Sequence, residues 1–320
     1  MMVPSRVGWF RLVFKYKGTE LPRTKWRIVG VFLLSIAVAW AEHVLEDEQF
    51  HSTLKPLPFT LIGFALSIFL GFRNNAAYDR WWEGRKLWGG IVNTTRTAAR
   101  QCLTLIGPQK GTPEAAKVDA AELRALQVEL VKRVMAWTHA LRLALRDQDD
   151  LSELGAFLPA DEVERLKTES NRPAAITMGT ADRLRAAFDK GWIHPMHLST
   201  LEHTLAGLTD LQGGCERIKS TPIPFSYTTL IHRIVAVYCY ALPFGVVTEM
   251  GWFTPFVVLV VSYAFFGLDI VGDEIEQPFG TDSNDLPLSA ISRMIEVNLR
   301  QRLGETELPP LLRPVNEQLI

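Results

Sequence analysis

The chain has 320 residues, with 34 Lys and Arg against 35 Asp and Glu, so its formal net charge at pH 7 is −1. This balance excludes the strongly basic field that nucleic-acid binding requires. The three cysteines, Cys102, Cys215 and Cys239, are too far apart for a CxxC metal motif or a disulfide framework, and we expect free thiols.

Hydrophobic residues make up 48% of the chain, and four long apolar runs predict four membrane-spanning helices. A helix needs about 20 mostly apolar residues to cross the hydrocarbon, because lipid offers backbone amides no partner. The runs cover residues 28–44, 57–72, 230–248 and 252–270. Pro56 and Pro58 suit the first turn of the second helix. The basic N-terminal segment has no small-residue cleavage site, so we expect the first helix to be retained.

Charges beside these spans predict their orientation. The connections within the two pairs are acidic and hold Glu46, Asp47, Glu48 and Glu249. Basic residues cluster on the other side, at Lys25, Arg27, Arg73, Arg80, Arg85, Lys86, Arg217 and Lys219. The positive-inside rule therefore places both termini and the middle of the chain in the cytosol. Asp269 and Asp273, at the inner end of the fourth span, depart from this pattern.

The middle of the chain predicts a helical domain. Apolar residues recur there with a helical period, as at Leu130, Val134 and Trp137. Glycine and proline breaks fall at 107–113, 155–159, 171–173 and 191–195, and Asp161 with Glu164 fits a capping box. No proline interrupts residues 71–101, so the second span should continue beyond the membrane. We therefore divide the chain into 1–75, 76–225, 226–272 and 273–320.

The sequence lacks the standard catalytic motifs, and we expect that the protein is not an enzyme. It has no Walker loop, no GxGxxG after a strand, no HExxH and no GxSxG. His194, His197 and His203 form either a metal site or a hydrated helix start. The acidic run that includes Asp282 and Asp285 is either a site for a hard cation or a solvated turn.

The second span carries an apolar stripe at helical spacing. Its members are Leu57, Leu61, Phe64, Ile68 and Phe72, and small residues such as Gly63 and Gly71 lie between them. Small residues allow helices to approach closely. In a single bundle the stripe would face the core or the lipid. If several copies surround an axis, its rings would form a hydrophobic constriction that gates by dewetting.

Several short motifs together resemble the bestrophin family. They are Gly71-Phe72-Arg73 leading to Arg80-Trp81-Trp82, then Ile223-Pro224 before the third span, and Pro278-Phe279-Gly280 followed by Asp282 and Asp285. The resemblance extends over roughly residues 6–300. The pair Asn74-Asn75 and the segment 213–218 are typical of the bacterial branch.

The resemblance implies an all-α membrane protein of four spans and a cytosolic helical domain, assembled as a homopentamer around one pore in the bacterial inner membrane. It implies a neck at Phe64, Ile68 and Phe72, a second aperture near Met196, and passage of monovalent cations. A calcium-regulated chloride channel, as in animal bestrophins, is the alternative. Asp282 and Asp285 match two acids of the animal calcium clasp. Glu274 and Gln277 depart from that clasp, so we expect no cofactor.

Two other classes of function remain open. A secondary transporter needs ionisable groups near the midplane of the membrane. The first span holds Ser35, the second Thr60 and Ser67, and the third Tyr238 and Tyr240, so we predict no proton or sodium site. A scaffold whose spans only anchor the helical domain is the third class. The expected partners are permeating ions, the lipid membrane and further copies of the chain.

Overall fold

The computed structural model describes residues 1–2, 8–44, 56–108 and 119–319. The described residues form helices and no β-strand, although isolated β-bridges such as Ile106–Ile193 occur. The acidic connection at Glu46, Asp47 and Glu48 lies outside them. The chain forms two compact units. The membrane unit comprises Pro4–Trp82 and Thr221–Pro278, and the helical unit comprises Met1–Val3, Glu83–Ser220 and Phe279–Ile320.

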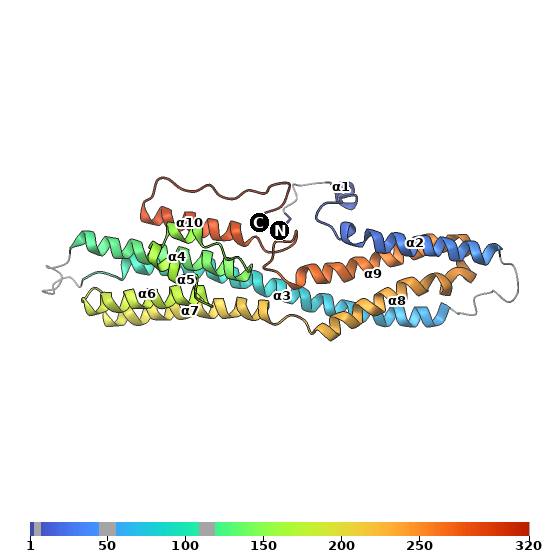
Figure 1. Ribbon diagram of the computed structural model, residues 1–320, viewed down its shortest axis with the longest axis horizontal. Coiled ribbons are helices and arrows are strands. Elements are labelled where there is room, and N and C mark those ends of the chain that lie inside the picture. The colour runs from blue at the N-terminus through green and yellow to red at the C-terminus, as the bar shows by residue number, and fades with distance from the viewer. Residues whose placement is uncertain (3–7, 45–55, 109–118, 320) are drawn as a thin grey trace. The chain divides into compact units, whose positions relative to one another are not determined.

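The membrane unit contains the four predicted spans, each on a helix. It holds α1 (Trp9–Val13), α2 (Leu21–Val44), the first part of α3 (Pro56–Thr104), α8 (Phe225–Met250), the short η3 (Gly251–Phe253) and α9 (Thr254–Glu276), as Figure 1 shows. Three stretches are long and apolar enough to cross a membrane: α2, α3 and Phe225–Glu276, the last of which comprises α8 and α9. The prediction of four membrane-spanning helices is therefore confirmed, and α3 begins at Pro56 as predicted.

One apolar core holds the membrane unit together. Its members come from all four long helices and include Val31, Leu70, Val235 and Val258. Helix α2 packs on α8 and α9, and α8 packs on α9. Gly63 lets α3 and α8 approach closely, since a Cβ there would lie 2.5 Å from the Tyr238 hydroxyl. The prediction that small residues permit close packing is correct at this position, whereas a Cβ at Gly71 would meet nothing within 4 Å.

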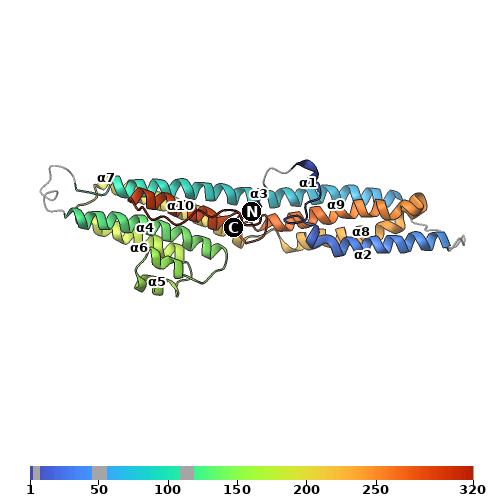
Figure 2. The ribbon, with the colours of Figure 1, turned by 90° about the horizontal axis from the view of Figure 1, so that it is seen from above.

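The helical unit is built around α4 (Ala120–Leu145). It also contains the rest of α3, the short η2 (Ser152–Ala156), α5 (Ala160–Leu166), α6 (Arg172–Asp189), α7 (Pro195–Ser220) and α10 (Leu288–Leu303), seen in Figure 2. Helix α4 packs on α6, α7 and α10, and nearly every residue from Leu130 to Leu141 is buried. This stretch of α4, with its buried Arg133 and His139, therefore lies in the centre of the bundle.

Local chemistry sets most helix boundaries in this unit. The Asn171 side chain caps α6 by accepting a hydrogen bond from the Ala174 N–H at 3.1 Å. The predicted break at residues 155–159 likewise separates η2 from α5. The capping box predicted at Asp161 is wrong, because α5 starts at Ala160 and its N-cap position is Pro159, which provides no side-chain cap. Asp161 instead accepts a hydrogen bond from Arg165 at 3.2 Å.

Candidate functional site

The predicted stripe lies on an exposed face of α3. Phe64 is 70% exposed, Ile68 43% and Phe72 62%, while Leu66 and Leu70 on the same helix are buried. With about 100° of rotation per residue, Ile68 and Leu66 project on opposite sides of the helix. One side of α3 therefore packs into the membrane unit. The other side presents large apolar side chains that no part of the described chain covers.

A buried ion-pair network begins one residue after the stripe. Arg73 is fully buried and donates to the Asp269 Oδ1 at 2.8 Å, to the Asp269 carbonyl at 3.2 Å and to Asp273. The His232 Nδ1 lies 2.7 Å from Asp269 Oδ2, and its Nε2 lies 3.4 Å from Asp273 Oδ1. The network ties α3 to α8 and α9, so it fixes the side of α3 that faces inward.

Sequence reasoning missed this network. The prediction considered only Tyr238 and Tyr240 in the third span, although His232 and Arg233 also lie within it. The signal was the acidic inner end of the fourth span, which departed from the charge pattern. Asp269 and Asp273 lie there because they neutralise Arg73.

The motif residues that carry the family resemblance meet in the membrane unit. The Arg80 Nε donates to the Glu276 carbonyl at 3.0 Å, and the Arg80 guanidinium also bonds the Thr221 carbonyl. The Ile223 N–H donates to the Glu276 Oε1 at 2.9 Å. Arg80 of α3, the segment that leads into α8 and the end of α9 are therefore joined by hydrogen bonds.

Met196, predicted to lie near a second aperture, is at the start of α7. Met196 is 71% exposed, and its N–H donates to the His194 Nδ1 at 3.1 Å. The rings of His194 and His197 lie 5.5 Å apart, and the His197 Nδ1 is 3.2 Å from the Leu105 carbonyl. In the described part of the chain, no three His, Cys, Asp or Glu residues gather as metal ligands. The metal alternative for this cluster therefore has no support in the geometry.

The acidic loop after α9 holds Asp282 and Asp285, the two residues that match acids of the animal calcium clasp. Asp285 is buried, and its Oδ2 accepts a hydrogen bond from the Asp282 N–H at 2.7 Å. Burial lowers the pKa of Arg146, and the nearby Asp285 carboxylate partly offsets that effect. The same guanidinium donates to the Ser289 hydroxyl at the start of α10 at 2.7 Å. Arg146 therefore lies close enough to Asp285 for the two charges to interact.

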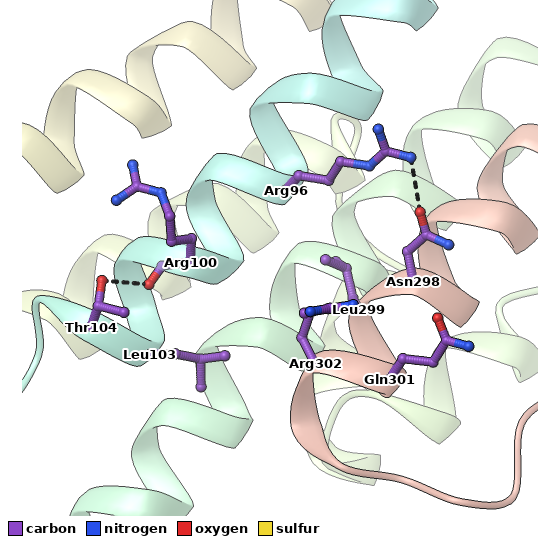
Figure 3. A pocket seen from close by; sticks show the side chains of 8 residues that line it. All are labelled: Arg96, Arg100, Leu103, Thr104, Asn298, Leu299, Gln301 and Arg302. Carbon is purple, nitrogen blue, oxygen red and sulfur yellow. Dashed lines mark hydrogen bonds between the residues drawn. The ribbon is translucent and has the colours of Figure 1, made fainter.

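The helical unit also has a basic pocket of about 560 Å³ between α3 and α10. The Arg96 Nη2 donates to the Asn298 Oδ1 at 2.9 Å across it (Figure 3). Arg100 and Arg302 also line it, but Figure 3 shows the Arg100 side chain turned away from α10. The arginines do not converge on one point, so the pocket is basic without being a formed anion site.

The membrane unit has long apolar helices, and one of them has an uncovered apolar face with a buried ion-pair network behind it. These features indicate a channel-forming membrane protein. Comparison with known proteins agrees: the model of the family "Bacterial/Fungal Bestrophin protein" matches residues 1–301. The chain belongs to this family, as the sequence motifs predicted.

Named relatives and a solved structure extend the match along the chain. A "voltage-dependent anion channel-forming protein" of Ralstonia nicotianae is 41% identical over 96% of both chains. The similarly named YneE of Escherichia coli K12 is 35% identical over 98% of both. The crystal structure of a bacterial bestrophin homolog from Klebsiella pneumoniae matches with a TM-score of 0.79 and 32% identity, covering 88% of this chain and 99% of that one. These likenesses support an ion channel in a bacterial membrane.

Proposed function

We propose that the chain is the subunit of a homopentameric ion channel in which the α3 stripe lines the neck of the pore. The observation that carries this proposal is the exposure of Phe64, Ile68 and Phe72 on the side of α3 opposite its packed face. Five copies around an axis would turn this stripe into stacked apolar rings. Such rings exclude water when narrow and conduct once widening lets water enter.

In the proposed pentamer, the exposed apolar side chains of α3 face the same side chains of the other subunits. Leaving one large apolar side chain in water rather than burying it costs about 1.5–3 kcal/mol. Lipid would remove this cost as well, but lipid offers no reason for an ionic anchor directly behind the stripe. The network at Arg73 holds the stripe in a fixed direction, as a ring assembled from five chains requires.

The apolar rings themselves favour neither sign of charge. The sequence resemblance to bacterial bestrophins implies passage of monovalent cations, whereas the relatives from Ralstonia nicotianae and Escherichia coli are named as anion channels. We keep cation passage as the prediction, and the reversal potential of the reconstituted protein under a potassium chloride gradient checks it. A reversal at the chloride equilibrium potential would replace it with the anion alternative.

Orientation is part of the same proposal. The basic residues flanking the spans support placing the helical unit in the cytosol and the spans in the inner membrane. A thiol-reactive, membrane-impermeant label tests this at a cysteine introduced in place of Met196, which is exposed, while the three native cysteines are buried. Labelling of intact spheroplasts before lysis would contradict the proposed orientation.

The neck is tested by Ile68→Ala in planar bilayers. The substitution removes three carbons from each of the five side chains in the Ile68 ring. This widens the constriction and makes wetting easier, so we expect open probability and unitary conductance to rise. Val260→Ala is the matched control, because Val260 is 67% exposed on α9, away from the stripe. If Ile68→Ala conducts like the unaltered protein, the neck assignment fails.

A proton-coupled transporter is the second candidate, and one observation favours it. His232, Asp269 and Asp273 form an ionisable cluster within the membrane unit, and such clusters serve proton relays in transporters. Unitary current steps from purified protein, present without a proton gradient, support the channel. Saturable flux that stops when the gradient is dissipated would support the transporter instead.

A further inference from the structure

Arg233 is an exposed arginine on a membrane-spanning helix. It follows Phe225, the first residue of α8, by eight positions. Among the described residues it makes no hydrogen bond or ion pair, whereas its neighbour His232 contacts both Asp269 and Asp273. A guanidinium within the bilayer is costly unless an anion or water reaches it. The fold of one chain therefore leaves this charge without a partner.

An apolar groove leads away from Arg233. It has a volume of about 290 Å³ and is lined by Phe59 and Ile62 of α3 and by Ile234, Val237, Tyr238 and Ala241 of α8. Because Arg233 precedes the other α8 residues, it lies at the end of the groove nearer Phe225. From Arg233 to Ala241 the helix rises about 12 Å. This is the length of an acyl-chain segment that starts below a headgroup.

The side chain of Arg233 can reach the level of a lipid phosphate. The 26 residues of α8 span about 39 Å, against about 30 Å for the hydrocarbon. If the helix is centred, each end extends about 4 to 5 Å beyond the hydrocarbon, which leaves Arg233 about 7 to 8 Å inside it. An arginine side chain bridges such a distance by extending toward the interface.

A second copy of the chain is a poorer partner for this charge. Residues 56–72 of α3 contain no carboxylate. The carboxylates of the described membrane unit near this level are Glu20, Asp269 and Asp273. Glu20 accepts a hydrogen bond from Tyr263 at 2.7 Å, and Arg73 and His232 engage the two aspartates. Another copy would offer apolar surface to the groove but no free anion to Arg233.

We propose that Arg233 and this groove bind one anionic glycerophospholipid, with the headgroup phosphate on the guanidinium and an acyl chain along α3 and α8. The combination of a lone cation and an adjoining apolar groove is complementary to such a lipid and to no purely ionic ligand. The site requires membrane embedding only, so it stands independently of pore architecture and ion selectivity.

Native mass spectrometry of the full-length protein in detergent, titrated with phosphatidylglycerol, tests the site. We expect Arg233→Gln to weaken lipid binding about 10-fold or more, as loss of a charge-assisted hydrogen bond predicts, and Arg233→Lys to restore most of it. Ala241→Trp, which fills the groove, should weaken binding to a similar extent. Arg100→Gln and Val260→Trp are the matched controls, an exposed arginine and an exposed apolar residue outside the groove, and neither should change it.

Three results would overturn the proposal. The first is equal phosphatidylglycerol binding by the protein with and without Arg233→Gln. The second is displacement of the lipid by millimolar inorganic phosphate, because it would show an anion site with no use for the acyl chain. The third is efficient disulfide formation between chains carrying Val237→Cys, because it would assign the groove to a second copy. All three are readable on folded protein, since Arg233 and Val237 are exposed.

Discussion

Replacing Arg73 by alanine should loosen the membrane unit more than any comparable change to an exposed arginine. Arg73 has no exposed surface and contacts two carboxylates, of which Asp269 is 2% exposed. Removing one partner of a buried pair costs about 3–5 kcal/mol, because the remaining charge stays buried. His232 still contacts Asp269 after the substitution, so we expect a cost at the lower end, about 3 kcal/mol.

A matched control is available on the same carboxylate. Arg27 also approaches Asp269, but at 4.0 Å and with its side chain 49% exposed. Half-exposed pairs at such distances contribute about 0–1 kcal/mol. The difference between Arg73→Ala and Arg27→Ala therefore isolates burial and geometry, since residue type and acid partner are the same.

Exposure of a buried thiol reports the effect. Cys239 is the buried cysteine of the membrane unit, and Cys102 and Cys215 of the helical unit can be replaced by alanine. The temperature at which Cys239 reacts with a thiol-specific dye should fall by roughly 6 °C or more in Arg73→Ala, given about 2–4 °C per kcal/mol. It should move by less than about 4 °C in Arg27→Ala. Equal shifts for the two variants would refute the reasoning.

Two further predictions use the same thermal assay. Burial lowers the pKa of His139, and Glu296 opposes this effect, so the unfolded chain binds more protons. Stability therefore falls as pH drops below about 6.5, the ordinary pKa of histidine. The loss is at most about 1.4 kcal/mol per pH unit. His139→Gln should flatten this dependence, measured at Cys102 or Cys215, and an unchanged slope would contradict it. Gly63→Ala should destabilise by about 1–3 kcal/mol against Tyr238, whereas Gly71→Ala should not, so shifts of equal size would contradict the packing.

Signals within one segment carried most of the successful sequence predictions. The apolar runs, the prolines at the start of α3 and the spacing of Phe64, Ile68 and Phe72 are all readable within a few turns of chain. The uninterrupted course of α3 to Thr104 was predicted for the same reason, because it requires only the absence of a breaker. The assignment of these residues to a pore neck is a proposal that an isolated chain does not test.

The missed features depend on contacts between distant segments. Arg73 and Asp269 are 196 positions apart, so neither residue's surroundings reveal that they pair. The position of Arg146 beside the Asp285 loop is equally remote in sequence. At Asp161 the local sequence favours a cap, but the N-cap position of α5 is Pro159, two residues earlier.

The two sides of α3 have different tolerances for change. Substitutions at exposed positions such as Phe64 and Ile68 typically alter folding stability by no more than about 0.5 kcal/mol. Substitutions on the inward side meet Arg73, Leu66 or Leu70, where each atom is constrained. Substitutions can therefore change the size and polarity of the outward side chains with little effect on folding. The buried inward side chains keep the orientation of the helix unchanged. Related chains with different side chains along this outward side would then differ in permeation but keep a common framework.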